Sequence, residues 1–381
     1  MLVKLTNQAL DYSWGSKSLI SDYFGVPATG QPMAEIWFGT HDGSPTKVEA
    51  NEGSLYELIG KRLPFLLKIL AAEAPLSIQA HPNPEQAKLG FALEEQAGIP
   101  LTAGHRNYKD DRAKPEMIVA LSPSFEALVG FSDPRIITEK IEELIDLGPS
   151  QHTEEVLNRW LQWLSEEQGI RRVFLDSLRS PEISEAFIAE FVDLATQSPN
   201  LVDLVSHLAN HHGHDRGIAS ALVLNHQIIS RGEAIFVPAG MPHAYLSGLG
   251  VEVMLASDNV LRGGLTPKHI DVDELERVLV FEDTSVQLCQ TRELAKGLEQ
   301  FAIPTAEFTF YRAVVSSTNL LIDLNLPGDA IVLCVGGSIA ISTSQAEREV
   351  INLGEAVYLS ADAKTFSLTG SGEAYLAISS N

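Results

Sequence analysis

The chain has 381 residues, which is enough for two or three domains with substantial cores. Its net charge of −23 argues against nucleic acid and anionic membrane surfaces as partners, so any phosphorylated substrate must meet a local basic pocket. No apolar run approaches the roughly 18 residues of a membrane span, and the first residues lack the apolar core of a signal peptide. The two cysteines, Cys289 and Cys334, lie in apolar surroundings. We therefore expect a cytoplasmic protein without a disulfide framework.

The first third of the chain, up to about residue 131, predicts strands and turns. Short apolar runs such as 33–39 and 64–70 alternate with glycine and proline. The pattern changes at Asp133-Pro134, because Asp at the N-cap and Pro at the first helical position begin a helix. Gly148-Pro149 ends that helix, and further helical patterns continue to about residue 208. We expect a helical insert over residues 134–229.

Strand patterns return after Arg231 and contain an internal repeat. Residues 232–239 (GEAIFVPA) and 354–361 (GEAVYLSA) are both a Gly-Glu turn that leads into an apolar strand, which is typical of two cupin jelly rolls. The expected fold class is therefore mainly β with an α-helical insert: two cupin-type jelly-roll β-barrel regions plus a helical domain. Residues 1–133 and 230–280 would form the first barrel, and residues 281–381 the second. Only the first copy of the repeat continues into a histidine, His243, so we expect metal in the first barrel alone.

The most informative segment is residues 75–83, PLSIQAHPN. If it is a strand, alternation places Ser77, Gln79 and His81 on one face and Ile78 and Ala80 on the other. The first face then offers a hydroxyl, an amide oxygen and an imidazole in a row, whereas the opposite face can pack on a core.

Four candidate metal ligands follow from the residues. Gln79 and His81 come from this segment, Glu116 precedes an apolar run in Lys114-Pro115-Glu116, and His243 shares a strand face with Tyr245. Two imidazoles, a carboxylate and an amide oxygen suit a divalent cation such as zinc, with an open position for water or substrate. Manganese and iron fit the same ligand types.

The chain resembles the type I mannose-6-phosphate isomerases of the cupin superfamily. The resemblance is carried by PLSIQAHP at 75–82, KPEM at 114–117, PHAY at 242–245, and the stretch from 252 through SDNVLR at 257–262. It extends to YSWG at 12–15 and AEIWFGTH at 34–41, so the matched segments run in the family's order from near residue 12 to about 271.

The resemblance implies a site residue by residue. A zinc ion, one per chain, would be held by Gln79, His81, Glu116 and His243. Arg262 falls on the family's active-site arginine, and pocket positions fall on Glu252 and Tyr245. Substrate-lining positions fall on Lys68, Lys114 and Ser77. The family often has Asn-His before the Lys-Pro-Glu, where this chain has Arg112-Ala113, so no histidine acts at that point. Asp42 likewise stands where many members have proline.

The implied reaction is the interconversion of mannose 6-phosphate and fructose 6-phosphate by metal-assisted proton transfer through a cis-enediol. A divalent metal and Arg262 would stabilise the developing negative charge on oxygen, and Lys68 and Lys114 would supply the basic pocket. His41, Glu252 and a metal-bound water are the candidate proton acceptors, and the sequence does not separate them. The expected partner is a small sugar phosphate, and we expect a monomer.

Two other functions compete with this interpretation. A cupin metal-dependent oxidoreductase would use iron on His81, Glu116 and His243, although Gln79 as a fourth ligand argues against it. A non-catalytic sugar-phosphate binding protein is the other, and Arg262 argues against that. The histidine-rich segment 211–215 (HHGHD) has no matching carboxylate framework, so we interpret it as a solvated interhelical loop rather than a metal site.

Overall fold

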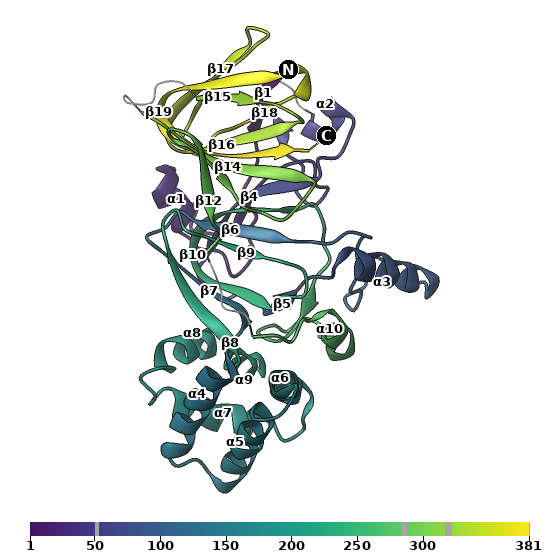
Figure 1. The fold of residues 1–381 in the computed structure, drawn as a ribbon, viewed down its shortest axis with the longest axis vertical. Helices are drawn as coiled ribbons and strands as arrows, with labels where there is room; N and C mark the ends of the chain where they lie inside the picture. The colour runs from purple at the N-terminus through teal and green to yellow at the C-terminus, as the bar shows by residue number, and fades with distance from the viewer. Residues whose placement is uncertain (50–52, 284–287, 317–321, 381) are drawn as a thin grey trace.

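The computed structural model describes residues 1–49, 53–283, 288–316 and 322–380. The molecule is elongated: a sheet that carries both chain ends lies at the top of Figure 1, a second sheet lies in the middle, and a bundle of helices lies at the bottom. The described part is mainly β with one run of helices, as the sequence predicts. Among its helices, none combines the length and the apolar character needed to cross a membrane.

The middle sheet is organised around one long strand, β10 (His243–Leu255), which pairs antiparallel with four others. β11 adds to β5, β2 to β4, β9 to β6 and β8 to β7. The bounds of these partners are β2 (Glu35–Phe38), β4 (Phe65–Ala72), β5 (Gln79–Ala80), β6 (Glu116–Ala120), β7 (Ser124–Phe131), β8 (Leu224–Ser230), β9 (Ala234–Val237) and β11 (Leu261–Arg262). The runs 33–39 and 64–70 thus form the predicted strands.

The upper sheet is built mainly from the C-terminal third of the chain. Its strands are β1 (Leu2–Thr6), β3 (Lys47–Val48), β12 (Thr291–Ala295), β13 (Leu298–Phe301), β14 (Phe308–Val315), β15 (Ile322–Asn325), β16 (Ala330–Thr343), β17 (Arg348–Asn352), β18 (Ala356–Leu359) and β19 (Thr365–Ser379). β1 pairs antiparallel with β18, and β3 pairs with β1, although both fall within the range 1–133 expected for the first barrel. The N-terminal strand therefore lies in the sheet of the C-terminal region.

The two Gly-Glu turns found in the sequence have the same backbone conformation. Gly232 and Gly354 both have φ +86°, where a side chain would be strained. Each following glutamate accepts a hydrogen bond from a backbone N–H three residues earlier, that of Ser230 at 2.7 Å and that of Asn352 at 2.8 Å. β9 and β18 then begin at equivalent places.

The helical bundle consists of α4 to α9, which follow one another without an intervening strand. Their bounds are α4 (Pro134–Asp146), α5 (Gln151–Leu164), α6 (Gly169–Arg179), α7 (Glu185–Ala195), α8 (Val202–His212) and α9 (Gly217–Ala221). α4 begins as predicted, because the Asp133 side chain caps the backbone N–H of Arg135. The core of the bundle includes Ile78 and Ala80, so the apolar side of the predicted metal-binding segment packs on the helices.

The remaining helices lie at the edges of the sheets. α3 (Pro84–Gln96) projects sideways from the middle sheet, near α10 (Val272–Val278) (Figure 1). α1 (Leu19–Phe24), α2 (Leu55–Ile59) and the 3₁₀ turn η1 (Ala361–Ala363) are short. A single apolar cluster contains residues of both sheets, including Phe65, Met117, Phe310 and Tyr375, and this shared core joins the sheets.

Candidate metal centre

Three predicted site residues lie directly opposite one another across neighbouring strands. Gln79 of β5 is the register partner of His243 on β10 and of Arg262 on β11. Directly opposed residues point to the same face of a sheet, so the imidazole, amide and guanidinium form one row. The structure thus places the amide oxygen of the predicted ligand set between the second histidine and the arginine.

His81, Glu116 and His243 meet in a buried cluster in which one ligand atom from each lies within 4.8 Å of the others. His81 Nε2 lies 3.3 Å from Glu116 Oε2, and His243 Nε2 lies 2.9 Å from Glu116 Oε1. The relative exposures of these three residues are 0%, 3% and 2%, respectively. Sequence reasoning grouped these residues correctly although they come from three distant segments.

A hydrogen bond from Nδ1 to a backbone carbonyl fixes the orientation of each imidazole. His81 Nδ1 lies 2.7 Å from the carbonyl oxygen of Asn259, and His243 Nδ1 lies 3.1 Å from that of Met241. A carbonyl only accepts, so each Nδ1 carries the hydrogen and donates it. Burial and the nearby Lys114 ammonium lower the pKa of His81 to about 4, so its ring is neutral at pH 7. Its Nε2 lone pair therefore points at the cluster, as in metal-ligating histidines.

The donor set of this cluster fits a cation. Glu116 Oε2 is buried and accepts no hydrogen bond from the residues that the structure describes, although Lys114 Nζ lies 3.1 Å away. Burial opposes ionisation of Glu116, but Lys114 and the two histidines outweigh it and hold its pKa well below the usual range. An ionised carboxylate that faces imidazole nitrogens in a dry site is the arrangement that a divalent metal satisfies.

A second row of side chains crosses the same sheet. Trp37 of β2, Lys68 of β4 and Glu252 of β10 are successive register partners. Lys68 Nζ lies 3.0 Å from Glu252 Oε2, 3.4 Å from Glu35 Oε1 and 4.7 Å from the Trp37 ring centroid. Burial disfavours the charge on Lys68, but the carboxylates of Glu252 and Glu35 outweigh it and raise its pKa. Lys68 is therefore a fixed cation that two carboxylates hold.

An irregularity in β10 brings the two rows into one pocket. Simple alternation would place Tyr245 and Glu252 on opposite faces, because they are seven residues apart. The register against β7 shifts between Tyr245 and Ser247, so one extra residue reverses the parity of the strand. Tyr245 and Glu252 consequently line the same cavity, which has a volume of about 220 Å³.

This cavity gathers most of the candidate residues. Its walls include Glu35, Lys68, Gln79, Lys114, Glu116, His243, Tyr245, Glu252 and Lys268. The Tyr245 hydroxyl donates to Glu116 Oε1 at 3.1 Å, and burial together with Glu116 and Glu252 raises its pKa well above the usual value. Burial, with Glu116 nearby, raises the pKa of Glu252 above its usual value, against the opposing effect of Lys68. A larger cavity of about 760 Å³, behind Ala113 and Pro115, has none of the candidate side chains in its described walls.

Sequence reasoning missed two charged residues of this pocket, Glu35 and Lys268. Glu35 was matched only as part of the segment 34–41, and its contact with Lys68 is visible only once β2 is paired with β4. Lys268 lies six residues after Arg262, and burial together with Arg262 lowers its pKa. A basic residue soon after the arginine segment was the available signal for Lys268.

His41 and Ser77 lie differently from the residues of the cavity. His41 lines a neighbouring cavity, where its Nδ1 accepts from the Gly43 N–H at 3.1 Å and its Nε2 lies 3.2 Å from Asp258 Oδ2. Both ring nitrogens of His41 are thus engaged. The Ser77 hydroxyl accepts from Gln79 Nε2 at 3.3 Å, which turns the amide oxygen of Gln79 away from Ser77.

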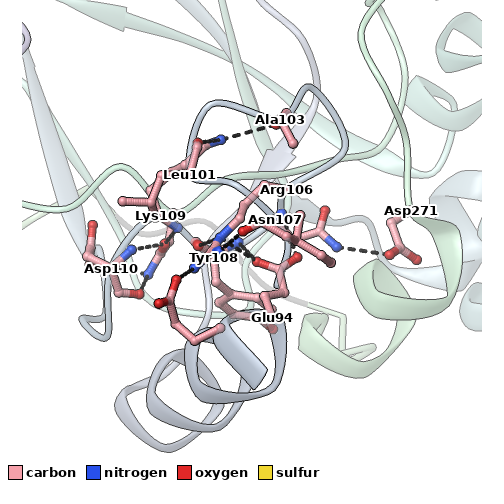
Figure 2. Close-up of polar contacts among 12 residues, drawn as sticks. Glu94, Leu101, Ala103, Arg106, Asn107, Tyr108, Lys109, Asp110 and Asp271 are labelled. Atoms are coloured by element: carbon pink, nitrogen blue, oxygen red, sulfur yellow. Dashed lines mark hydrogen bonds and ion pairs between the residues drawn. The ribbon is translucent and has the colours of Figure 1, made fainter. Parts of the chain in front are cut away.

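The carbonyl that orients His81 belongs to a tightly bonded loop junction. The Asn259 side chain accepts from the backbone N–H of Lys109 at 2.6 Å and donates to the carbonyls of Asp110 and Arg112, both at 2.8 Å. Further hydrogen bonds hold this loop against α3 (Figure 2). There Glu94 of α3 accepts from the backbone N–H groups of the residues at 107 and 108, at 2.9 and 2.8 Å.

Comparison with known proteins identifies relatives of this chain. The family model "Phosphomannose isomerase type I, catalytic domain" matches residues 2–133. The chain is 34% identical to the mannose-6-phosphate isomerase of Salmonella typhimurium and 33% identical to that of Escherichia coli, with 97% of each chain covered.

Solved structures show the same likeness. A crystal structure of the Salmonella typhimurium enzyme, described as bound to fructose 6-phosphate and zinc, matches with a TM-score of 0.89 at 31% identity over 100% of both chains. A zinc-bound holo structure of a mannose 6-phosphate isomerase matches equally well, with a TM-score of 0.89. The likeness confirms the fold class expected from the sequence.

Proposed function

The chain belongs to the family of type I mannose-6-phosphate isomerases, which interconvert mannose 6-phosphate and fructose 6-phosphate, and we propose that the His81–Glu116–His243 centre is where it performs this reaction. The observation that carries the proposal is the buried carboxylate between two oriented imidazoles, in the wall of the same cavity as Glu252. Family membership also decides against the two alternatives, because the relatives are isomerases rather than oxygen-using enzymes or binding proteins.

Zinc is the metal that this donor set would hold. His81 and His243 would bind it through Nε2, Glu116 through its carboxylate and Gln79 through its amide oxygen. When bound, zinc supplies a Lewis acid that lowers the energy of negative charge on a sugar oxygen. The carbonyls of Asn259 and Met241 hold the imidazoles ready for it, and the Glu116 oxygen without a hydrogen bond supports the assignment.

Glu252 is the residue best placed to move the proton. In the aldose-to-ketose direction, its carboxylate takes the proton from C2, the electrons of that C–H bond form the C1=C2 double bond, and the C1 carbonyl oxygen takes up a proton to give the enediol. Glu252 then returns its proton to C1 while the C2 hydroxyl gives up its proton and becomes the carbonyl, so the proton lost from O2 balances the one gained by O1. Its raised pKa makes the carboxylate a stronger base than an ordinary glutamate, which favours removal of a proton from carbon. Lys68, 3.0 Å away, keeps the carboxylate in place. His41 is less suited, because it lines another cavity and both its nitrogens are engaged.

Other polar residues in and beside the cavity position the substrate. Arg262, directly opposite Gln79, would place a guanidinium beside the oxygens that gain negative charge. Lys268 lines the cavity and has no acidic partner among the described residues, so its ammonium would meet the phosphate. Lys114 and Ser77 would bind sugar hydroxyls, and Tyr245 would donate a hydrogen bond in the pocket rather than act as an acid, because its pKa is raised.

A coupled assay of mannose 6-phosphate conversion tests the proposal. We expect activity that disappears on chelation and returns when zinc is added, while magnesium does not restore it. A folded, zinc-replete sample without activity would refute the assignment. Activity that is insensitive to a strong chelator would instead show that the His81–Glu116–His243 cluster is not the catalytic centre.

We also propose a cytoplasmic monomer in which the first barrel and the helical insert together form the catalytic unit. The unpaired thiols of Cys289 and Cys334 support a reducing compartment. Light scattering after size exclusion tests the monomer, since a dimer would have twice the 41.4 kDa chain mass.

A further inference from the structure

The histidine-rich segment 211–215 contains a residue with an unexpected connection to the active-site arginine. The structure places the first two histidines in the last turn of α8, which corrects the interhelical loop expected from the sequence. Asp215 follows this turn, and its Oδ1 accepts from the backbone N–H groups of Gly217 and Leu265, both at 2.7 Å. Its Oδ2 lies 3.3 Å from the N–H of Thr266. One carboxylate of the helical insert therefore holds the segment that follows Arg262.

That segment has a backbone conformation which needs external support. Leu265 has φ +56° although it carries a side chain, and it is only 1% exposed. A left-handed conformation costs a non-glycine residue roughly 1 kcal/mol or more, so it persists only where the surroundings impose it. The hydrogen bond from the Leu265 N–H to Asp215 fixes that N–H in the required direction.

The insert and the arginine segment also touch through their backbones. A Cβ atom on Gly217 would lie 2.4 Å from the Leu265 nitrogen, and one on Gly264 would lie 2.3 Å from the Gly217 Cα. On its other side the segment bonds to the strand of the metal site, because Ile78 accepts from the Gly263 N–H at 2.8 Å and donates to the Gly264 carbonyl at 3.1 Å. The segment is thus held between the insert and the residues that carry Gln79 and His81.

We propose that Asp215 is a positioning residue, which sets the place of Arg262 relative to Gln79 and His243 through its bonds to the segment 264–266. The inference deepens the proposed function and rests on the role of Arg262 stated there. Asp215 is not among the described residues that line the substrate cavity. It therefore acts through the arginine segment rather than on the substrate. The helical insert is then a working part of the active site.

Two substitutions distinguish the hydrogen-bond-accepting oxygen of Asp215 from its negative charge. D215A removes the oxygen that accepts both 2.7 Å bonds, so we expect kcat/KM to fall at least tenfold. D215N keeps an oxygen at that place and loses only the longer contact with Thr266, so we expect a fall of no more than threefold. Zinc content should match the wild type in both variants.

A matched control measures the effect of weakening the insert in general. Asp176 lies within the bundle, where its side chain accepts from the Trp160 indole at 2.7 Å and from Arg159 at 3.1 Å. We expect D176A to lower the thermal midpoint by at least as much as D215A, with kcat/KM unchanged within twofold.

A double-mutant cycle with R262A is the decisive measurement. If Asp215 acts through Arg262, adding D215A to R262A lowers kcat/KM by less than twofold further. A further tenfold loss in the double variant, or a D215A enzyme as active as the wild type, would overturn the inference. R262A alone tests the role of Arg262 in the proposed function, because near-normal activity in this variant would refute that role. A hundredfold loss in R262A together with a fully active D215A would confirm the role of Arg262 and refute only the positioning role of Asp215.

Discussion

Asn259 offers the sharpest test of how the metal centre is supported, because one fully buried side chain serves both the fold and a metal ligand. Its exposure is 0%, and its Oδ1 accepts from the N–H groups of Lys109 at 2.6 Å and Asp110 at 3.2 Å. Its Nδ2 donates to the carbonyls of Asp110 and Arg112, both at 2.8 Å. Its own carbonyl accepts from His81 Nδ1. Asn259→Ala removes the side-chain bonds and releases the carbonyl from its fixed position.

The expected magnitude follows from the number of bonds. Each hydrogen bond contributes roughly 1 kcal/mol net, and the substitution removes four of them from part-buried backbone groups, so the free energy of unfolding should fall by about 3–4 kcal/mol. The released carbonyl no longer fixes the His81 ring. Loss of such an outer partner typically weakens metal binding about 10- to 100-fold, which is the expected fall in zinc affinity.

Urea unfolding and competition with a chelator measure the two effects separately. Asp176→Ala serves as the control here too, because its carboxylate accepts from the Trp160 indole at 2.7 Å and from Arg159 at 3.1 Å within the helical bundle. The control should lose stability and keep its zinc affinity. A loss of under about 1 kcal/mol in Asn259→Ala, or a zinc affinity equal to that of the control, would refute the reasoning.

Three further predictions concern buried ionisable groups. Glu252→Gln keeps the shape of the side chain and removes the proton acceptor, so kcat in the coupled assay should fall about 10²- to 10⁴-fold at unchanged zinc content; a smaller loss would assign the proton to another group. Burial lowers the pKa of Lys140 to about 8 in the folded state, whereas an unfolded lysine titrates near 10.5. Burying the charged ammonium therefore lowers the free energy of unfolding below pH 8, and this destabilisation disappears as the pH rises towards 10.5. Lys140→Met should therefore raise the free energy of unfolding by about 1–3 kcal/mol at pH 7 and by much less at pH 10, and an equal gain at both pH values would contradict the cause. Burial opposes ionisation of Glu126, but hydrogen bonds from His207 and His226 outweigh it and lower its pKa far below 4.5. The ionised Glu126 therefore stabilises the fold above pH 4.5, and this contribution is lost as the pH falls below that value. The unfolding midpoint of Glu126→Gln should decline less than that of the wild type over the same pH range.

The parts of the site that local rules govern could be predicted from the sequence. Alternation in residues 77–81 correctly separated Gln79 from Ile78 and Ala80, because the period of a strand is fixed and an apolar face needs a core. The start of α4 followed from a capping residue and a proline, which act within one turn. Strand alternation and helix capping therefore predicted which residues of this segment share a face and where the helical insert begins.

The parts that depend on distant partners could not be predicted. The register shift near Tyr245 reverses which residues of β10 face the cavity, and nothing local in the sequence marks it. The pairing of β1 with β18 joins residues more than 350 positions apart, so residues 1–133 could not be divided correctly by composition. Glu35 and Lys268 were missed for the same reason, since their role exists only once β2 and the arginine segment are in place.

The short strands of the metal site explain why a helical insert belongs to this enzyme. β5 and β11 contain two residues each, which is too few for ladder hydrogen bonds alone to hold Gln79 and Arg262 in register. The helical insert supplies the additional contacts. Its apolar core covers Ile78, Ala80 and Leu261, and the Asp215 carboxylate binds the backbone just beyond Arg262. The helices thus pack against the side of these short strands that carries Ile78 and Ala80, opposite the cavity. Loss of the Asp215 carboxylate should therefore disturb Arg262 more than His81, whose support comes from Asn259 and the loop at Lys109.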